Sequence, residues 1–204
     1  MESIYGKYAD TLPKVMDHIV SAIRQYSEEE KTKSGELTYE HLIYRVKSED
    51  SIREKCDRKG LPQTARSALY DIRDALGLRI VCRFVDDIYL NIERIRAIPG
   101  CAIVEEKDYI KNVKPNGYRS YHMIISLETP YEDVQGNVPG TYYAEIQLRT
   151  IAMDSWASLE HQMKYKHDIK NPEIIVRELK RCADELAACD MSMQTIRNLI
   201  RAEH

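Results

Sequence analysis

Hydrophobic and polar positions alternate most regularly over residues 142–150, YYAEIQLRT. One side of this segment is apolar and the other carries a glutamate, a glutamine and an arginine, which is the two-residue period of a strand with one buried face. A second alternating segment, LIYRVK at residues 42–47, has a basic side. Shorter apolar runs predict three more strands, at residues 77–84, 102–106 and 118–125.

Apolar residues spaced three or four positions apart predict helices around these strands. Such stripes cover residues 13–25, 64–74, 88–95, 151–163 and 172–200. The predicted caps at helix starts are Thr11, the capping box Ser51–Glu54, Asp86 or Asp87, and Thr150. The charged run SEEEKTKSGE at residues 27–36 is interpreted as a solvated loop. The pattern as a whole predicts an α/β fold, with a mixed sheet and helices at both ends.

Charge and cysteine content narrow the range of partners. The chain has 30 lysines and arginines against 33 aspartates and glutamates, a formal net charge of −3, which argues against a nucleic-acid coat or a basic membrane-binding surface. Its five cysteines form no CxxC pair, and no segment approaches the ~18 apolar residues of a membrane span. We therefore expect a soluble cytoplasmic protein with reduced cysteines and no membrane partner.

Basic side chains gather on the predicted sheet and on the short helix that the capping box Ser51–Glu54 opens. They are Arg45, Lys47, Lys55, Lys59, Arg79 and Arg83. Each alone is typical of a solvated surface charge. As a group projecting from one sheet, they suit a polyphosphate, whose negative charge must be neutralised locally in a chain with no basic excess.

Two carboxylates stand out against this positive background. Asp74 lies at the entrance to one predicted strand, and Glu145 projects from the polar side of another. Each alone is also consistent with a turn cap or an ion-pair partner. Together they predict a Mg²⁺ site, because Mg²⁺ is usually held by one or two carboxylates plus the phosphate oxygens of a substrate. Cations beside phosphates and a metal at the reacting phosphorus are what phosphoryl-type transfer requires.

The segment KPNGYRSYH, residues 114–122, is crowded with polar and aromatic groups at a strand entrance. Asn116 and Gly117 predict a turn, after which Tyr118 is free to lie flat beneath a nucleobase, with Arg119 and His122 reaching phosphates. The alternative is that Tyr118 is an ordinary packing residue at the strand edge. The six histidines show no metal-binding spacing such as HxH or HExxH.

Four motifs together resemble the synthetase domain of the RelA/SpoT family, and the chain is similar to its single-domain members. They are RVKSEDSIREKCDRK, DALGLRIVCRFVDDI, KPNGYRSYH, and EIQLRTIAMDSWASLEH followed by YK. The resemblance implies a nucleotidyltransferase-like fold that transfers the β,γ-pyrophosphate of ATP to the ribose 3′-hydroxyl of GDP or GTP. It also implies an N-terminal helical extension over residues 1–38, a synthetase domain over 39–168 and a C-terminal helix over 169–204.

The resemblance assigns a role to each matching residue. Asp74 becomes a Mg²⁺ ligand, and Glu145 the second carboxylate and a candidate base for the 3′-hydroxyl. The ATP side comprises Arg45 and Arg79 bracketing the adenine, with Lys47, Ser51, Lys55 and Lys59 around the phosphates. On the acceptor side Tyr118 stacks on guanine, and its neighbours there are Lys114, Arg119, His122 and Gln147.

Two alternative functions remain open, and the resemblance also implies an oligomeric state. One alternative is a toxin-like relative that pyrophosphorylates adenosine nucleotides or tRNA 3′ ends; the other is a catalytically dead module that binds nucleotides or RNA. The paired carboxylates argue against the dead module. Resemblance to the single-domain members implies a homo-oligomer, a tetramer. An apolar helical stripe predicted to lie exposed agrees with this, and its members are Val176, Leu179, Ala183 and Leu186.

Overall fold

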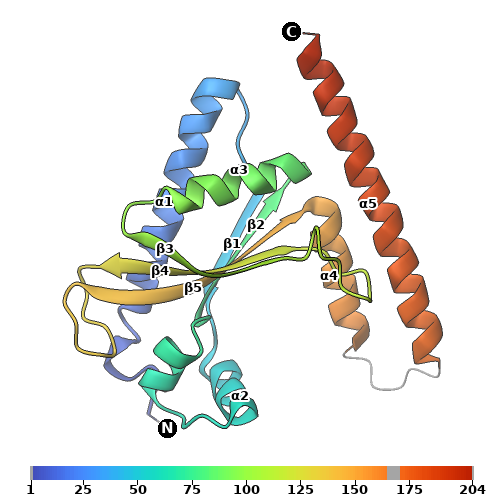
Figure 1. The fold of residues 1–204 in the computed structure, drawn as a ribbon. Coiled ribbons are helices and arrows are strands. Elements are labelled where there is room, and N and C mark those ends of the chain that lie inside the picture. Colours follow the sequence, from blue (N-terminus) through green and yellow to red (C-terminus); the bar gives the residue numbers. More distant parts are fainter. Residues whose placement is uncertain (1, 165–170, 204) are drawn as a thin grey trace.

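Five strands form one mixed sheet in the computed structural model, which describes residues 2–164 and 171–203 (Figure 1). The strands are β1 (His41–Val46), β2 (Leu76–Cys82), β3 (Cys101–Asp108), β4 (Tyr121–Thr129) and β5 (Gly140–Thr150). They lie in the order β1-β2-β5-β4-β3, with β2 and β5 parallel and all other neighbours antiparallel. The predicted α/β fold with a mixed sheet is therefore confirmed.

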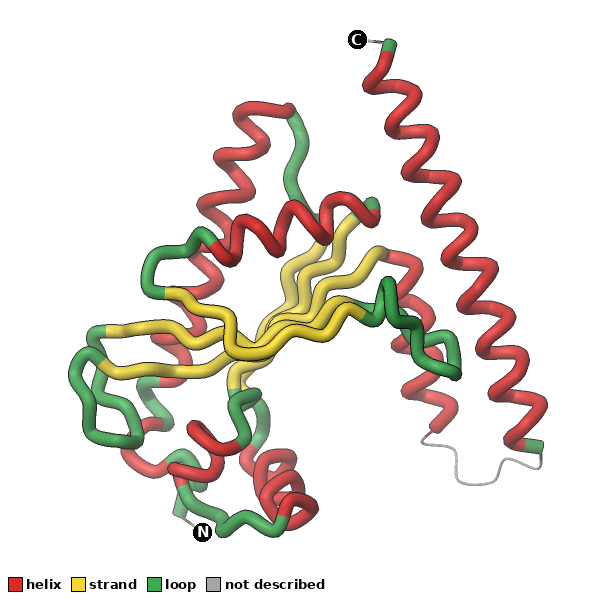
Figure 2. Tube along the Cα trace, viewed as in Figure 1, coloured by secondary structure: helices red, strands yellow, loops and turns green. Residues whose placement is uncertain are grey.

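The helices surround this sheet (Figures 1 and 2). They are α1 (Leu12–Ser34), α2 (Glu49–Lys59), α3 (Val85–Arg96), α4 (Ile151–Lys164) and α5 (Pro172–Ala202), with a 3₁₀ turn at Gly6–Tyr8 and a π-helical turn at Ser67–Asp71. Among the described residues, no helix is both long enough and apolar enough to cross a membrane. The predicted domain boundary after residue 168 falls outside the described residues.

One face of the sheet is apolar, and α1 and α3 pack on this face to form the main hydrophobic core. Members of this core from both layers are Ile19, Ile23, Ile80, Ile88, Ile92, Met123 and Ile146. Burying each such side chain contributes about 1.5–3 kcal/mol. A buried hydrogen bond from the Tyr26 hydroxyl of α1 to Asn91 Oδ1 of α3, 2.7 Å long, joins the two helices.

The opposite face of the sheet is polar, and strand register determines which side chains meet there. Glu145 on β5 stands opposite Gly77 on β2. Gln147, two residues later, stands opposite Arg79 on β2 and His122 on β4. Because residues two apart on a strand share a face, these polar side chains project together into the space beneath the sheet.

Several predicted element ends are wrong. The charged run at residues 27–36 is not a loop, because α1 continues through it and ends where Gly35 takes a left-handed φ of 79°. Glutamate and lysine are good helix formers, and pairs such as Gln25–Glu29 (3.0 Å) support the added turns. The start of α2 is capped by Ser48, whose Oγ accepts from the Ser51 N–H, and not by Ser51 itself.

Two further predictions fail in part. The stretch predicted as a helix over residues 64–74 is helical only over residues 65–71, most of it the π-helical turn, and the strand predicted from residue 118 begins at Tyr121. Thr150 does cap α4, since its Oγ1 accepts from the Met153 N–H at 3.1 Å. Thr11 occupies the cap position of α1 without a side-chain hydrogen bond.

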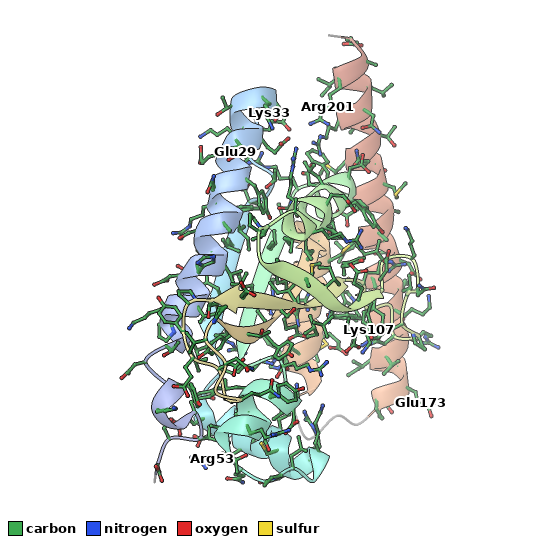
Figure 3. All side chains as sticks on the ribbon, turned by 60° about the vertical axis from the view of Figure 1, so that its left-hand side comes forward. Glu29, Lys33, Arg53, Lys107, Glu173 and Arg201 are labelled. Carbon is green, nitrogen blue, oxygen red and sulfur yellow. The ribbon has the colours of Figure 1, made fainter. Side chains whose placement is uncertain are left out.

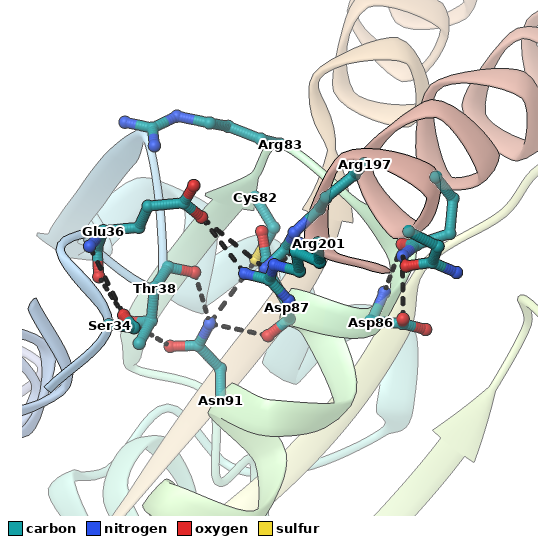
Figure 4. Close-up of polar contacts among 12 residues, drawn as sticks. Ser34, Glu36, Thr38, Cys82, Arg83, Asp86, Asp87, Asn91, Arg197 and Arg201 are labelled. Carbon is teal, nitrogen blue, oxygen red and sulfur yellow. Dashed lines mark hydrogen bonds and ion pairs between the residues drawn. The ribbon is translucent and has the colours of Figure 1, made fainter. Parts of the chain in front are cut away.

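Near its C-terminal end, α5 is fastened to α3 (Figure 4). Arg197 donates to the buried Asp87 at 2.5 Å, and Gln194 donates to Asp86 at 2.8 Å. The cap position of α3 is Phe84, so the prediction that Asp86 or Asp87 occupies it is wrong. One turn further along α5, Arg201 (labelled in Figure 3) donates to Glu36 at 3.2 Å.

The apolar stripe predicted to be exposed on α5 is mostly covered. Ala183 is buried against Trp156 of α4, and Leu179 and Leu186 pack around them. Val176 remains exposed. The exposed apolar side chains of α5 are instead Ile174, Val176, Met191, Met193, Ile196, Leu199 and Ile200.

Candidate active site

Two grooves meet on the polar face of the sheet, and Glu145 lines both of them. The larger groove, about 640 Å³, runs between β1, β2, β5 and α4. Its lining includes Arg45, Lys47, Arg79, Tyr118, Glu145 and Gln147. The smaller groove, about 300 Å³, lies between α2 and strands β3 and β4. Its lining includes Lys55, Lys59, Asp74, Lys107, His122 and Glu145. The structure thus brings together most of the residues predicted from sequence.

The backbone just before Asp74 is shaped in an unusual way. The π-helical turn ends at Asp71, and Arg73 adopts a φ of 56°, which is the only positive φ of a non-glycine residue in the described part of the chain. A left-handed conformation at such a residue costs of order 1–3 kcal/mol, and such conformations cluster at functional sites. Here it aims Asp74 into the groove before β2 begins.

Asp74 is the centre of a compact charge cluster. Its Oδ2 accepts from Lys47 Nζ at 2.5 Å and also from Lys55 Nζ. The Lys47 ammonium lies 3.8 Å from Glu145 Oε2, so one cation contacts both carboxylates. The Asp74 side chain is only 7% exposed, which leaves it little solvent to stabilise its charge. A lysine just after β1, a lysine on α2, a carboxylate just before β2 and a carboxylate on β5 therefore converge at one point.

Glu145 is held in its ionised form. The His122 imidazole, whose Nδ1 lies 3.6 Å from Oε1, and the Lys47 ammonium together lower the pKa of Glu145 from 4.5 to about 2, against a desolvation effect that raises it. A negative charge at this position is therefore present at any pH near neutrality.

These carboxylates fit a divalent cation. Asp74 Oδ1 is buried and has no hydrogen-bond partner among the described residues, whereas its Oδ2 is doubly paired. The unpaired Oδ1 of Asp74 is therefore available to coordinate a metal ion that binds together with the substrate. Within residues 2–164 and 171–203 no three histidine, cysteine, aspartate or glutamate side chains cluster as a metal cage. Two carboxylates completed by substrate oxygens suit Mg²⁺ better than such a cage.

The predicted ATP-side residues are less uniformly placed. Arg45, exposed on the edge strand, stands opposite Gly77, and Arg79 reaches Asp154 of α4 at 3.2 Å. Both arginines line the larger groove. Ser51, on the first turn of α2, lines neither groove.

The turn KPNG is pressed against α5. Gly117 closes the turn with an N–H to Lys114 carbonyl bond of 2.8 Å and has a φ of 90°. A Cβ placed on Gly117 would lie 2.6 Å from Ala183 Cβ, so the close approach of α5 requires glycine. Asn116 donates to Glu160 of α4 at 3.0 Å. The turn is thereby fixed between two helices.

Tyr118 is half-buried and lines the larger groove through a ring held on several sides. Its hydroxyl lies 2.8 Å from His122 Nε2, and the Lys114 ammonium lies 4.9 Å from its ring centroid. Trp156 and Tyr109 meet the ring edge-on, with centroids 6.2 and 6.0 Å away. A ring restrained in this way loses little further freedom when a base stacks on it.

Arg119 does not join the groove. Its guanidinium donates to the Ala183 carbonyl at 3.1 Å and to Asp184 at 3.0 Å, both on α5. The structure therefore separates Arg119 from the phosphate-facing position predicted for it. Arg149 and Asp154, by contrast, received no role from the sequence and lie beside Tyr118 and Arg79. The alternation along β5 had placed Arg149 on the same side as Glu145, which was the only available signal.

Comparison with known proteins shows which family and which proteins the chain is similar to. The family described as "Region found in RelA / SpoT proteins" matches residues 44–170, more than half of the chain. The chain is 41% identical to GTP pyrophosphokinase YwaC of Bacillus subtilis over 163 residues, covering 80% of this chain and 76% of YwaC. It is 37% identical to GTP pyrophosphokinase YjbM of the same organism over 162 residues, covering 79% and 74%.

Solved structures agree with these sequence matches. The small alarmone synthetase 2 of Bacillus subtilis superposes with a TM-score of 0.77 at 36% identity, covering 92% of this chain and 95% of the other. The small alarmone synthetase 1 of Bacillus subtilis bound to its product pppGpp superposes with a TM-score of 0.69 at 33% identity, covering 92% and 98%.

Proposed function

The chain belongs to the RelA/SpoT family, and from this premise we propose that it transfers the β,γ-pyrophosphate of ATP to the ribose 3′-hydroxyl of GDP or GTP. The products are ppGpp or pppGpp, and AMP. The observation that carries this proposal is the convergence of Asp74, Glu145 and the lysines at the junction of two grooves, beside a tyrosine that is presented for stacking.

The donor nucleotide is assigned to the basic side of this junction. Arg45 and Arg79 flank the larger groove and supply planar cations that stack on the faces of an adenine. Lys47, Lys55 and Lys59 supply positive charge for the triphosphate. Ser51 lies outside both linings, and its assignment to the phosphates rests on the family resemblance alone.

Asp74 and Glu145 are the residues that would hold Mg²⁺. When bound there with substrate oxygens, the ion supplies positive charge at the reacting phosphate and orients it. The lysine ammonium groups that neutralise the two carboxylates without nucleotide are then free to pair with phosphate oxygens instead. Before ATP binds, the ammonium groups of Lys47 and Lys55 balance the charges of the two carboxylates.

The transfer forms a bond between the acceptor 3′-oxygen and the β-phosphorus of ATP and breaks the bond from that phosphorus to the α,β-bridging oxygen. AMP leaves with the bridging oxygen. Glu145, ionised because its pKa is about 2, accepts a hydrogen bond from the 3′-hydroxyl and takes up its proton as the new bond forms. Such a weak base suffices because phosphoryl transfer proceeds through a loose transition state, in which positioning and charge supply most of the rate.

The acceptor nucleotide is assigned to the end of the larger groove that contains Tyr118. The ring offers a stacking surface for guanine, and Lys114, His122 and Gln147 surround it with polar groups. Arg119 makes its contacts with α5, so its part in acceptor binding is to fix the turn.

A homo-oligomer, a tetramer by resemblance, is the proposed assembly. Exposed apolar side chains along the outer side of α5 support it, because a monomer would leave them in water; those of the distal half are Met191, Met193, Ile196, Leu199 and Ile200. The cytoplasm is the proposed compartment, consistent with five cysteines that all lie unpaired in the structure.

The proposed reaction is tested with ATP labelled on its γ-phosphate. Purified protein is incubated with this ATP, Mg²⁺ and one acceptor at a time: GDP, GTP, GMP, an adenosine nucleotide or tRNA. Label in a guanosine product with equal release of AMP supports the proposal. Label only in an adenosine nucleotide or tRNA supports the toxin-like alternative, and nucleotide or RNA binding without transfer supports the dead module.

A further inference from the structure

Arg149 is a buried charge at the end of β5, and the proposed transfer assigns it no role. The residue is 6% exposed, and its guanidinium lies under the acceptor side of the larger groove. Isolated buried charge is costly, so an arginine at such a position is retained only with several polar partners. The nature of those partners shows what the residue can do.

Four hydrogen bonds fan out from this guanidinium. One terminal nitrogen donates to the Tyr118 hydroxyl at 2.8 Å and to Gln147 Oε1 at 3.0 Å. The other donates to Asp154 Oδ1 at 3.0 Å, and Nε donates to Ser120 Oγ at 3.3 Å. Three of the four partners belong to the KPNGYRSYH segment or to the acceptor-side strand β5. Arg149 therefore joins the separate pieces of the acceptor site.

The bond from Arg149 to Tyr118 begins a chain of polar contacts that continues to His122 and Glu145. An arginine only donates, so the Tyr118 oxygen accepts from Arg149, and the same oxygen lies 2.8 Å from His122 Nε2. His122 Nδ1, on the other side of the imidazole, lies 3.6 Å from Glu145 Oε1. A single buried donor at the base of the site thus fixes the hydroxyl of the stacking ring, which in turn contacts the histidine beside Glu145.

Asp154 keeps Arg149 in place from the other side. Its Oδ1 accepts from Arg149 at 3.0 Å and lies 3.2 Å from the Arg79 guanidinium. This shared carboxylate neutralises the buried arginine. It occupies one terminal nitrogen of the guanidinium and leaves the other directed at Tyr118 and Gln147.

We propose that Arg149 is a positioning residue for the acceptor nucleotide, acting through the Tyr118 hydroxyl. Its hydrogen bonds go to protein groups, and through one of them it sets the ring on which the guanine stacks. This inference rests on the proposed function, because it takes the occupant of the Tyr118 end of the groove to be a guanosine nucleotide.

Direct binding measurements separate this role from a purely structural one. Titration calorimetry gives the Kd of GDP and, separately, of a non-hydrolysable ATP analogue. The proteins compared are the wild type, Arg149→Met, Tyr118→Phe and the double variant. Each single variant is expected to weaken GDP binding roughly tenfold, the effect of one hydrogen bond to a charged donor. The double variant is expected to match the single ones, because all of them remove the same link. The Kd of the ATP analogue stays within about twofold.

Arg197→Met is the matched control. Arg197 is also a largely buried arginine paired with an aspartate, Asp87, but it fastens α5 to α3 away from both grooves (Figure 4). It is expected to lower thermal stability without a selective loss of GDP affinity. The proposal is overturned if Arg149→Met binds GDP as the wild type does, or if it loses affinity for both nucleotides equally.

The isosteric variant covers the case in which Arg149→Met does not fold. Tyr118→Phe keeps the ring and removes only the hydroxyl, so an unchanged GDP affinity in this variant also overturns the proposal. A wild-type protein that binds no guanosine nucleotide contradicts the proposed function instead. The two failures are therefore distinguishable.

Discussion

Gly117 and Ala183 are in direct contact, although the chain between them crosses two strands and a helix. A Cβ on Gly117 would lie 2.6 Å from Ala183 Cβ, closer than real Cβ atoms approach. The turn that presents Tyr118 is therefore seated against α5, and its position depends on that helix. Arg119, bonded to the Ala183 carbonyl, reinforces the same contact.

This contact predicts an unequal effect of two glycine substitutions. Gly117→Ala is expected to destabilise the protein by roughly 1–3 kcal/mol and to weaken GDP binding, because both the φ of 90° and the contact with α5 oppose a side chain. Gly136→Ala is the control, since Gly136 also has a positive φ, 85°, but no heavy atom within 4 Å of the added Cβ. Chemical denaturation measures both. Equal destabilisation would show that the contact with α5 contributes nothing.

Removing the stacking ring separates the two nucleotide sites. Tyr118→Ala is expected to weaken guanosine-nucleotide binding by about 1–3 kcal/mol, the value of one base stack, and to leave the affinity for ATP nearly unchanged. Separate titrations with GDP and with a non-hydrolysable ATP analogue provide the measurement. A comparable loss of affinity for both nucleotides would place Tyr118 on the donor side or in the structural frame.

The lowered pKa of Glu145 predicts that the free energy of unfolding decreases at acidic pH. Because the folded pKa is about 2 and the ordinary value is 4.5, ionised Glu145 stabilises the fold above pH 4.5, and this stabilisation is lost as pH falls toward 2. Between pH 5 and pH 3 the wild type should lose about 2 kcal/mol more unfolding free energy than Glu145→Gln. Urea denaturation of both proteins at the two pH values gives this difference. Parallel losses would mean that the Glu145 charge is not favoured by its neighbours.

The exposed side of α5 predicts self-association. Light scattering at micromolar concentration should give a mass well above the 23.8 kDa of one chain. Ile196→Glu should shift the mass toward the monomer, because it buries a charge in the proposed interface. Ser21→Glu, at an exposed position of α1, controls for added charge on a helix. A wild-type protein that is monomeric under these conditions would reject the assembly.

Much of the fold was predictable because its signals are local. The alternation over residues 142–150 identified β5 and the face that carries Glu145, and Thr150 was correctly predicted to cap α4. Errors arose where two local signals compete. Ser48 and Ser51 are both good caps, and only the structure shows that Ser48 has the extended backbone that a cap requires.

The charged residues of the site could be predicted from the sequence, but the hydrogen bonds between residues far apart in the chain could not. Asp74, Lys47 and Glu145 could be grouped because strand order brings their segments together. The link from Arg149 to Tyr118 joins positions 31 residues apart and depends on how the turn folds back over β5. Arg119 was misplaced for the same reason, since its partner Asp184 lies 65 residues away on a helix that sequence alone does not dock.

The most direct test of the central claim is transfer of label from γ-labelled ATP to GDP, measured for the wild type, Asp74→Asn and Asp57→Asn. Asp74 has a buried, unpaired Oδ1 at the proposed metal position, whereas Asp57 is exposed on α2 and its side chain accepts a hydrogen bond from Gln63. The wild type and Asp57→Asn are predicted to form labelled ppGpp and AMP at equal rates, and Asp74→Asn about a thousandfold more slowly with its fold intact. Wild-type turnover in Asp74→Asn, or no transfer to GDP or GTP by the wild type, would contradict the account.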